Sequence, residues 1–215
     1  MPPIQRAQIE GEIFSDINSN AKSVPADILL HVQMNKYPLS DLGLARKVIE
    51  RLNSEKIFFK KFEMSSLDKG KIKIASIIKF ALRYLVTIES KDRKSLYYFW
   101  EGDKSALIKF DQDAFDEYIN YCIKNITDFF SAVKKNFNAE WHNPQSKLLS
   151  VTAINGFIIA FNKIIDKDGV KDFNYYDQRL QKLGIDFSKD NFPYTSSQYS
   201  KFSEKIIDEA FRDTE

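Results

Sequence analysis

A long amphipathic stretch between Asp113 and Asn136 sets the architecture that this sequence can adopt. Its large apolar residues recur three or four positions apart, which predicts one face of a single long helix. These residues are Phe115, Tyr118, Ile119, Cys122, Ile126, Phe129, Phe130 and Val133. Negative charge at Asp111 and Asp113 favours a helix N-terminus there. We therefore expect the longest helix of the protein at about residues 113–136, with this apolar face buried.

The rest of the chain is also predicted to be mainly helical. Its 215 residues contain only 7 Gly and 6 Pro but 18 Phe and 10 Tyr, a balance that favours long helices and short connections. A dense apolar run from Ile77 through Phe80 to Val86 indicates a mostly buried helix. Further helices are expected at about residues 5–18, 25–32, 41–52, 148–165, 175–183 and 197–211. The sequence thus predicts a mainly α, multi-helix protein.

Residues 56–74 interrupt the helical pattern. Large apolar residues crowd at the start of this segment, as in a strand or a buried irregular segment. At its end Ile72 and Ile74 alternate with Lys71 and Lys73, as in a half-buried strand. We therefore expect a small β-hairpin near residues 56–74. The charged residues 89–95 indicate a boundary between a segment at 1–88 and a helical domain at 96–215.

Five lysines flank the predicted hairpin and are candidates for contacts with a DNA backbone: Lys60, Lys61, Lys69, Lys71 and Lys73. Strand alternation places Lys71 and Lys73 on one face. Clustered lysines bind phosphates with release of counterions, but lysines also protect an edge strand against aggregation. The formal net charge of the chain is only +2, which favours the edge-strand interpretation.

The sequence contains no complete set of catalytic residues. It has no glycine-rich phosphate-binding loop and no HExxH, GxSxG or CxxC motif. Cys122 is the only cysteine, and the two histidines, His31 and His142, are far apart, so a zinc site is not expected. An acidic cluster at residues 111–117 could hold a divalent cation, but charge at a helix N-terminus explains it more simply. We therefore expect no metal and no cofactor.

The cellular compartment is predicted from features that the sequence lacks. No apolar stretch approaches the roughly 20 residues that span a bilayer. The first residues have no apolar core of a signal peptide, and a lone cysteine cannot form an intrachain disulfide. We expect a cytoplasmic protein that does not enter the membrane.

One segment resembles a known family. The stretch Phe14-Ser15-Asp16-Ile17-Asn18-Ser19-Asn20-Ala21-Lys22-Ser23-Val24, followed by paired leucines, is similar to a motif of the DGQHR-domain family. That family is related to the ParB/sulfiredoxin-like fold and includes DndB-like proteins of DNA phosphorothioation systems. Residues 45–53 resemble its next helix, so the similarity covers about residues 7–75. The Asp-Gly-Gln-His-Arg element that names the family is absent, so the chain resembles the C-terminal portion of a longer member.

The resemblance implies a DNA-associated protein of a DNA-modification, phosphorothioation-like or phage-defence system, with a regulatory or scaffold role. Asn18 and Lys22 would then lie near a nucleotide or phosphate, although a turn between two helices would equally explain Asn18. Two alternatives stay open. The chain could be part of a ParB-like nucleotide hydrolase or nuclease, or a helical module that binds protein partners of such a system through its surplus of Phe and Tyr.

Overall fold

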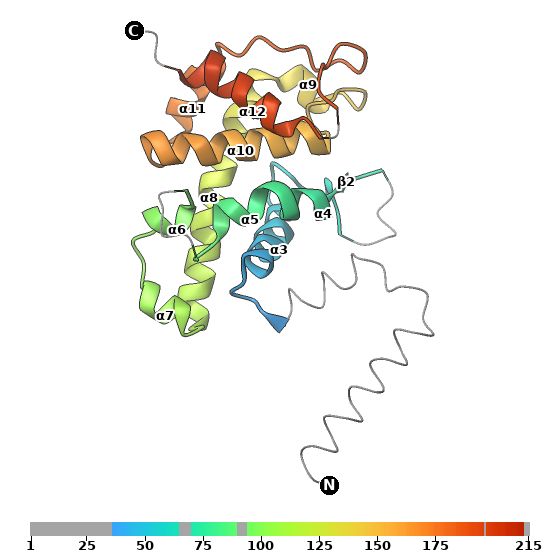
Figure 1. Cartoon of the computed structure of the whole chain (residues 1–215). Helices are drawn as coiled ribbons and strands as arrows, with labels where there is room; N and C mark the ends of the chain where they lie inside the picture. The colour runs from blue at the N-terminus through green and yellow to red at the C-terminus, as the bar shows by residue number, and fades with distance from the viewer. Residues whose placement is uncertain (1–35, 65–69, 90–93, 196, 213–215) are drawn as a thin grey trace, which may run out of the picture. The chain divides into compact units, whose positions relative to one another are not determined.

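The computed structural model describes residues 36–64, 70–89, 94–195 and 197–212 of the chain. The described elements belong to one compact unit that begins at Tyr37. The fold is mainly α, as predicted, with one two-stranded sheet (Figure 1). The helices predicted at residues 5–18 and 25–32, and the motif between them, lie outside the described residues. Elements on both sides of residues 89–95, where the sequence indicated a division, pack against each other within this unit.

The elements follow one another in a fixed order along the chain. They are α3 (Asp41–Leu52), β1 (Phe62–Glu63), β2 (Ile72–Lys73), α4 (Ile74–Ile77), the π-helical turn η1 (Ile78–Leu82), α5 (Arg83–Val86), α6 (Leu96–Phe99), α7 (Lys104–Ile108), α8 (Gln112–Asn136), α9 (Asn138–His142), α10 (Val151–Asp168), α11 (Phe173–Leu180), α12 (Tyr199–Ile206) and a second π-helical turn, η2 (Ile207–Phe211). Helix α8 is the longest helix among the described residues, as the sequence predicts.

Side-chain caps mark the N-termini of α3 and α8, two helices whose bounds the sequence predicted closely. The Ser40 hydroxyl accepts a hydrogen bond from the Gly43 N–H at 3.1 Å and begins α3. The Asp111 carboxylate accepts one from the Ala114 N–H at 3.0 Å and begins α8. Each cap satisfies a backbone donor that has no partner within its own helix.

The expected hairpin is wrong in its strand direction. Strands do form within residues 56–74, but β1 and β2 run parallel, with Phe62 opposite Ile72 and Glu63 opposite Lys73. Alternation of side chains marks where a strand lies and which residues share a face, but it carries no information on strand direction. The fold class is unaffected, because the sheet has only two residues in each strand.

Helices α4, η1 and α5 follow without a break and form one helical segment, residues 74–86. This segment packs against α3 on one side and α10 on the other (Figure 1). It begins directly after β2, so Lys73 ends the strand and precedes the helix. The lysines near the sheet and the exposed side of this helix are therefore joined by the backbone itself.

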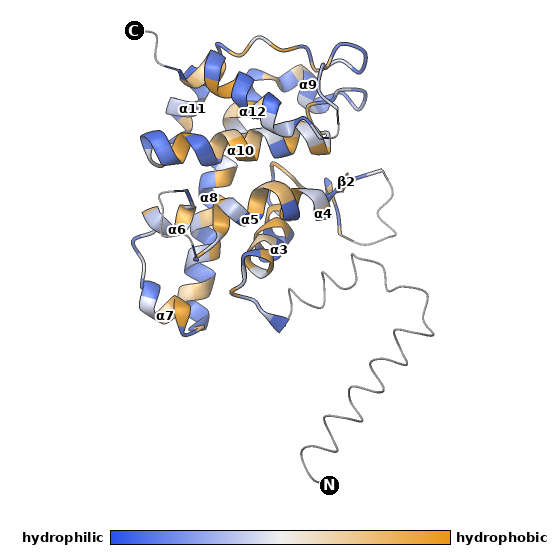
Figure 2. Ribbon diagram, in the orientation of Figure 1, coloured by the Kyte–Doolittle hydropathy of each residue, from blue (hydrophilic) through white to orange (hydrophobic). Residues whose placement is uncertain are grey.

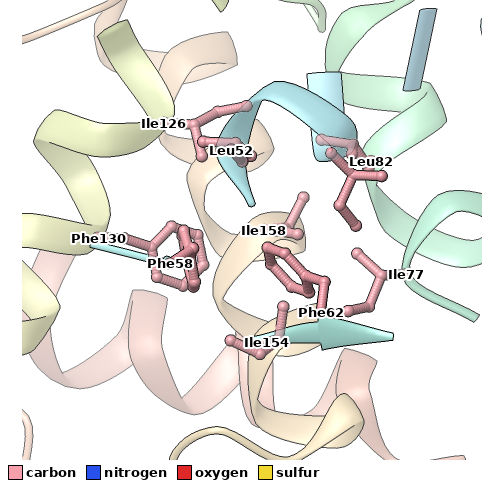
Figure 3. A pocket seen from close by; sticks show the side chains of 10 residues that line it. Leu52, Phe58, Phe62, Ile77, Leu82, Ile126, Phe130, Ile154 and Ile158 are labelled. Atoms are coloured by element: carbon pink, nitrogen blue, oxygen red, sulfur yellow. The ribbon is translucent and has the colours of Figure 1, made fainter. Parts of the chain in front are cut away.

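The core is filled by apolar side chains from α3, α8, α10 and the segment before β1. Figure 2 shows hydrophobic and hydrophilic residues on the same helices, as amphipathic helices require. Figure 3 shows Phe58, Phe62 and Phe130 around a gap of about 10 Å³ lined by carbon. Such a gap is at the lower limit for one water and has no polar lining, so it is a packing defect and not a ligand site.

Helices α10 and α12 approach closely at Gly156. A methyl group added there would lie 2.3 Å from Cδ1 of Phe202, a fully buried ring held between other aromatic side chains. We expect Gly156→Ala to lower the free energy of unfolding by about 1–3 kcal/mol, because this clash outweighs the better helix propensity of alanine. Urea denaturation checks the value. In a Phe202→Leu background, Gly156→Ala should lower the free energy of unfolding by less than it does in the wild type. A Gly156→Ala variant that is more stable than the wild type would contradict the close approach.

Candidate nucleic-acid interface

The structure places four of the candidate lysines at the surface around the strand pair. Lys60 and Lys73 are exposed, and Lys61 and Lys71 are half-buried. The backbone of Lys60 is left-handed, with φ 54°, and its N–H donates to the Asn53 carbonyl at 3.0 Å. Lys69, Asn18 and Lys22 lie outside the described residues.

The pairing of the strands indicates which of these lysines share one face. Phe62 lies opposite Ile72 and is buried, so this pair faces the core. Neighbouring positions point the other way. The outer face therefore presents Lys73 and, opposite it, the carboxylate of Glu63. Lys61 and Lys71 directly precede the two strands, and the same alternation places them on this face. We call Lys61, Lys71 and Lys73 the lysine face. Three ammonium groups and one carboxylate give this small sheet a positive outer surface.

The exposed side of helical segment 74–86 continues this surface with aromatic rings. Phe80 is 42% exposed and Tyr84 is 54% exposed, and they lie four positions apart, as neighbours on one helix face. A cation covers each ring. Lys79 Nζ lies 5.4 Å from the Phe80 ring centre, and Arg83 Cζ lies 5.1 Å from that of Tyr84. Cation–π pairs at such exposed sites contribute about 0.5–1 kcal/mol each.

Contacts with other helices hold this set in place. The Phe80 ring stacks on Tyr199 at the start of α12, with centres 5.8 Å apart and planes 26° apart. The Arg83 guanidinium pairs with the Asp41 carboxylate at 2.6 Å, which fixes the guanidinium and offsets part of its charge. We call Lys73, Lys79, Phe80, Arg83, Tyr84 and Tyr199 the basic–aromatic face.

Sequence reasoning missed the aromatic part of this site. It assigned Phe80 to a mostly buried run, whereas its ring is partly exposed. The signal was present as a repeat: Lys79-Phe80 and Arg83-Tyr84 are two cation–aromatic dipeptides four positions apart. That spacing brings both rings and both cations to one side of a helix.

The acidic cluster at the start of α8 is explained by the fold. Asp111 caps the helix, and Asp116 pairs with Arg51 and accepts a hydrogen bond from Gln112 at 2.9 Å. The bond from Gln112 and then the Arg51 contact lower the pKa of the Asp116 carboxyl. Across the described part of the chain, no three His, Cys, Asp or Glu residues are grouped to hold a metal ion.

A shallow groove of about 690 Å³ lies between the loop after α6 and the outer side of α8. It is lined by Phe99, Trp100, Glu101, Gly102, Glu117, Asn120, Tyr121 and Lys124. Burial first of all, with nearby Cys122 and Glu101, raises the pKa of the Tyr121 hydroxyl to about 12. Lys124 bonds to Asp128 at 2.9 Å. A phenol that keeps its proton near neutral pH supplies neither a nucleophile nor a base there.

Within residues 36–64, 70–89, 94–195 and 197–212, no helix combines the length and apolar character that crossing a membrane requires. Comparison with known proteins gives no identification: no family model, no curated protein and no solved structure matches the chain.

Proposed function

We propose that the protein associates with DNA in a DNA-modification or phage-defence system, with a regulatory or scaffold role. The setting rests on the resemblance of residues 7–75 to the DGQHR-domain family. The association itself is supported by the lysine face, in which alternation around the paired residues places Lys61, Lys71 and Lys73 on the outer side of the strand pair.

Clustered ammonium groups favour a polyanion, because each phosphate they neutralise releases condensed counterions. The chain as a whole is nearly neutral, with 32 Lys and Arg against 30 Asp and Glu, so its bulk charge would not attract DNA. Binding would depend on the local surface, and it should weaken steeply as salt is added.

We expect Lys71→Ala/Lys73→Ala to weaken binding of labelled duplex DNA and to reduce the salt dependence. Each lost phosphate contact lowers the slope of log affinity against log salt by about 1, so the double variant should lose about 2. Fluorescence anisotropy titrations from about 50 to 200 mM salt measure both quantities.

Lys182→Ala/Lys189→Ala is the matched control, because it removes the same charge from two exposed lysines between α11 and α12. It should bind like the unmodified chain. Equal losses in both double variants would mean that charge acts without a defined surface. Absence of binding at low salt would contradict the proposed function.

A protein-interaction module is the second candidate function, favoured by exposed apolar side chains at the end of α7 and just after it. Ile108 is 61% exposed and Phe110 is 45% exposed, although both are large and apolar. Adjoining exposed apolar residues mark contact surfaces between proteins. A stable hetero-complex formed by a chain that binds no DNA would favour this candidate.

A further inference from the structure

We infer that the basic–aromatic face binds single-stranded nucleic acid, with a base stacked on Tyr84, Phe80 extending the aromatic surface and phosphates held by the neighbouring cations. This inference rests on the proposed function and narrows it, because it names the form of nucleic acid that the surface accepts. It extends beyond the lysine face, which by itself would accept any polyanion.

The exposed rings carry the argument. Phe80 and Tyr84 leave 42% and 54% of their surfaces in solvent, on one side of segment 74–86. Stacking on an aromatic ring requires an accessible face of a base. Bases of a single strand offer both faces, whereas those of a duplex are covered by their neighbours. Rings on a convex helix can therefore contribute to binding a single strand and contribute little to binding a duplex.

The cations are placed to follow the backbone of such a strand. Lys79 and Arg83 each lie beside a ring, at 5.4 and 5.1 Å from its centre. Lys73 stands at the start of the helix and belongs to the lysine face as well. A helix rises about 1.5 Å per residue, so Lys73 and Tyr84 are separated by roughly 17 Å along its axis. Cations interleaved with rings over this length match the pattern of proteins that bind single strands.

The rings are also held in position before any ligand arrives. Tyr199 supports the Phe80 ring from α12, at 5.8 Å between centres. The ion pair with Asp41 holds Arg83 at the Tyr84 ring. Side chains fixed in this way lose less conformational entropy when they bind.

The nature of the neighbours favours nucleic acid over a protein partner for this face. A protein-docking surface usually has aromatic residues beside other apolar side chains, with few charges at its centre. Here the two rings alternate with Lys79 and Arg83 along the helix. Cations beside accessible rings suit a ligand that carries negative charge and flat bases together.

The test compares oligo-dT of about 20 nucleotides, longer than a usual site, with a duplex of the same length. The full chain is titrated as wild type, Tyr84→Ala and Tyr84→Phe, with fluorescence anisotropy as the readout. Tyr84→Ala should weaken single-strand binding about tenfold, because stacking of one base corresponds to about 5- to 150-fold in affinity. Tyr84→Phe keeps the ring and should stay within about twofold, and duplex binding should change little in either variant.

The outcomes separate this inference from the proposed function. If Tyr84→Ala leaves single-strand binding unchanged while duplex binding still depends on Lys71 and Lys73, the inference is overturned and the proposed function stays intact. Equal losses for single strand and duplex in Tyr84→Ala also overturn it, because a ring that stacks on bases should distinguish them. No binding of either DNA at low salt overturns both. Far-ultraviolet circular dichroism of each variant checks that the fold is retained, as expected for a side chain that is more than half exposed.

Discussion

Replacing Phe129 with alanine is expected to lower the free energy of unfolding by about 3–5 kcal/mol. Phe129 lies in the C-terminal half of α8 and is fully buried. Its ring stacks on Phe161 of α10, with centres 4.8 Å apart and planes 12° apart, and meets Tyr176 of α11 edge-on at 5.3 Å. Three helices therefore share this side chain. Domains are typically stable by about 5–15 kcal/mol, so this loss would be a large fraction of the total. Urea denaturation followed by circular dichroism measures it.

Phe59→Ala is the matched control, since it makes the same chemical change at a ring that is 57% exposed. Its effect should be within about 0.5 kcal/mol, as for most surface substitutions. A loss below about 1 kcal/mol for Phe129→Ala would contradict the packing of α8 against α10 and α11, because a closely packed aromatic cannot be removed at so small a cost.

The long helices could be predicted because their signals are local and repeated. Eight apolar positions at helical spacing define α8, and a capping residue marks its first turn. Helix α3 was predicted at about residues 41–52 and is found at Asp41–Leu52. When a dozen or more residues agree on one periodicity, few tertiary contacts can override the pattern.

The short elements could not be predicted, because tertiary packing decides them. Helices α6, α7 and α9 have four or five residues each, too few to show a period. The direction of β2 relative to β1 is parallel, which alternation of side chains does not encode. The π-helical turn at residues 78–82 is likewise absent from any local pattern.

The candidate site was likewise predicted only in part. Strand alternation predicted that Lys71 and Lys73 would share a face, and the same alternation around the pair Phe62 and Ile72 places Lys61 with them. The exposure of Phe80 was missed, because its dense apolar run indicated burial. Only the Lys79-Phe80 and Arg83-Tyr84 repeat marks the side of this helix that α3 and α10 leave uncovered. Asn18 and Lys22 stay predictions, since both lie outside the described residues.

Raising the pH is expected to destabilise the protein through groups buried in α8. Burial raises the pKa of the Cys122 thiol from its ordinary 9.0 to about 12. Burial also raises the pKa of Tyr118, whose hydroxyl donates to the Val86 carbonyl at 2.7 Å. Between pH 9 and about 12 the folded chain therefore holds protons that the unfolded chain releases. Stability is full below pH 9 and falls through this window, because the slope with pH is negative wherever the folded state binds more protons.

The loss of stability due to the Cys122 thiol alone can be calculated from its pKa. One pKa unit corresponds to about 1.4 kcal/mol, so a change from neutral pH to about pH 10.5 should remove about 2 kcal/mol through Cys122. Tyr118 acts in the same direction once the pH passes its ordinary value of 10.0. Urea denaturation at the two pH values gives the difference in the free energy of unfolding.

Cys122→Ala tests whether the thiol is responsible. Alanine leaves a small cavity and should cost about 1 kcal/mol near neutral pH, but it removes the titrating group. The variant should therefore lose about 2 kcal/mol less than the wild type when the pH is raised, so that at about pH 10.5 it should be more stable than the wild type by about 1 kcal/mol. If both lose the same amount, the thiol titrates alike in the folded and unfolded chains. Cys122 would then be accessible to water, and the buried face of α8 would have to be assigned differently.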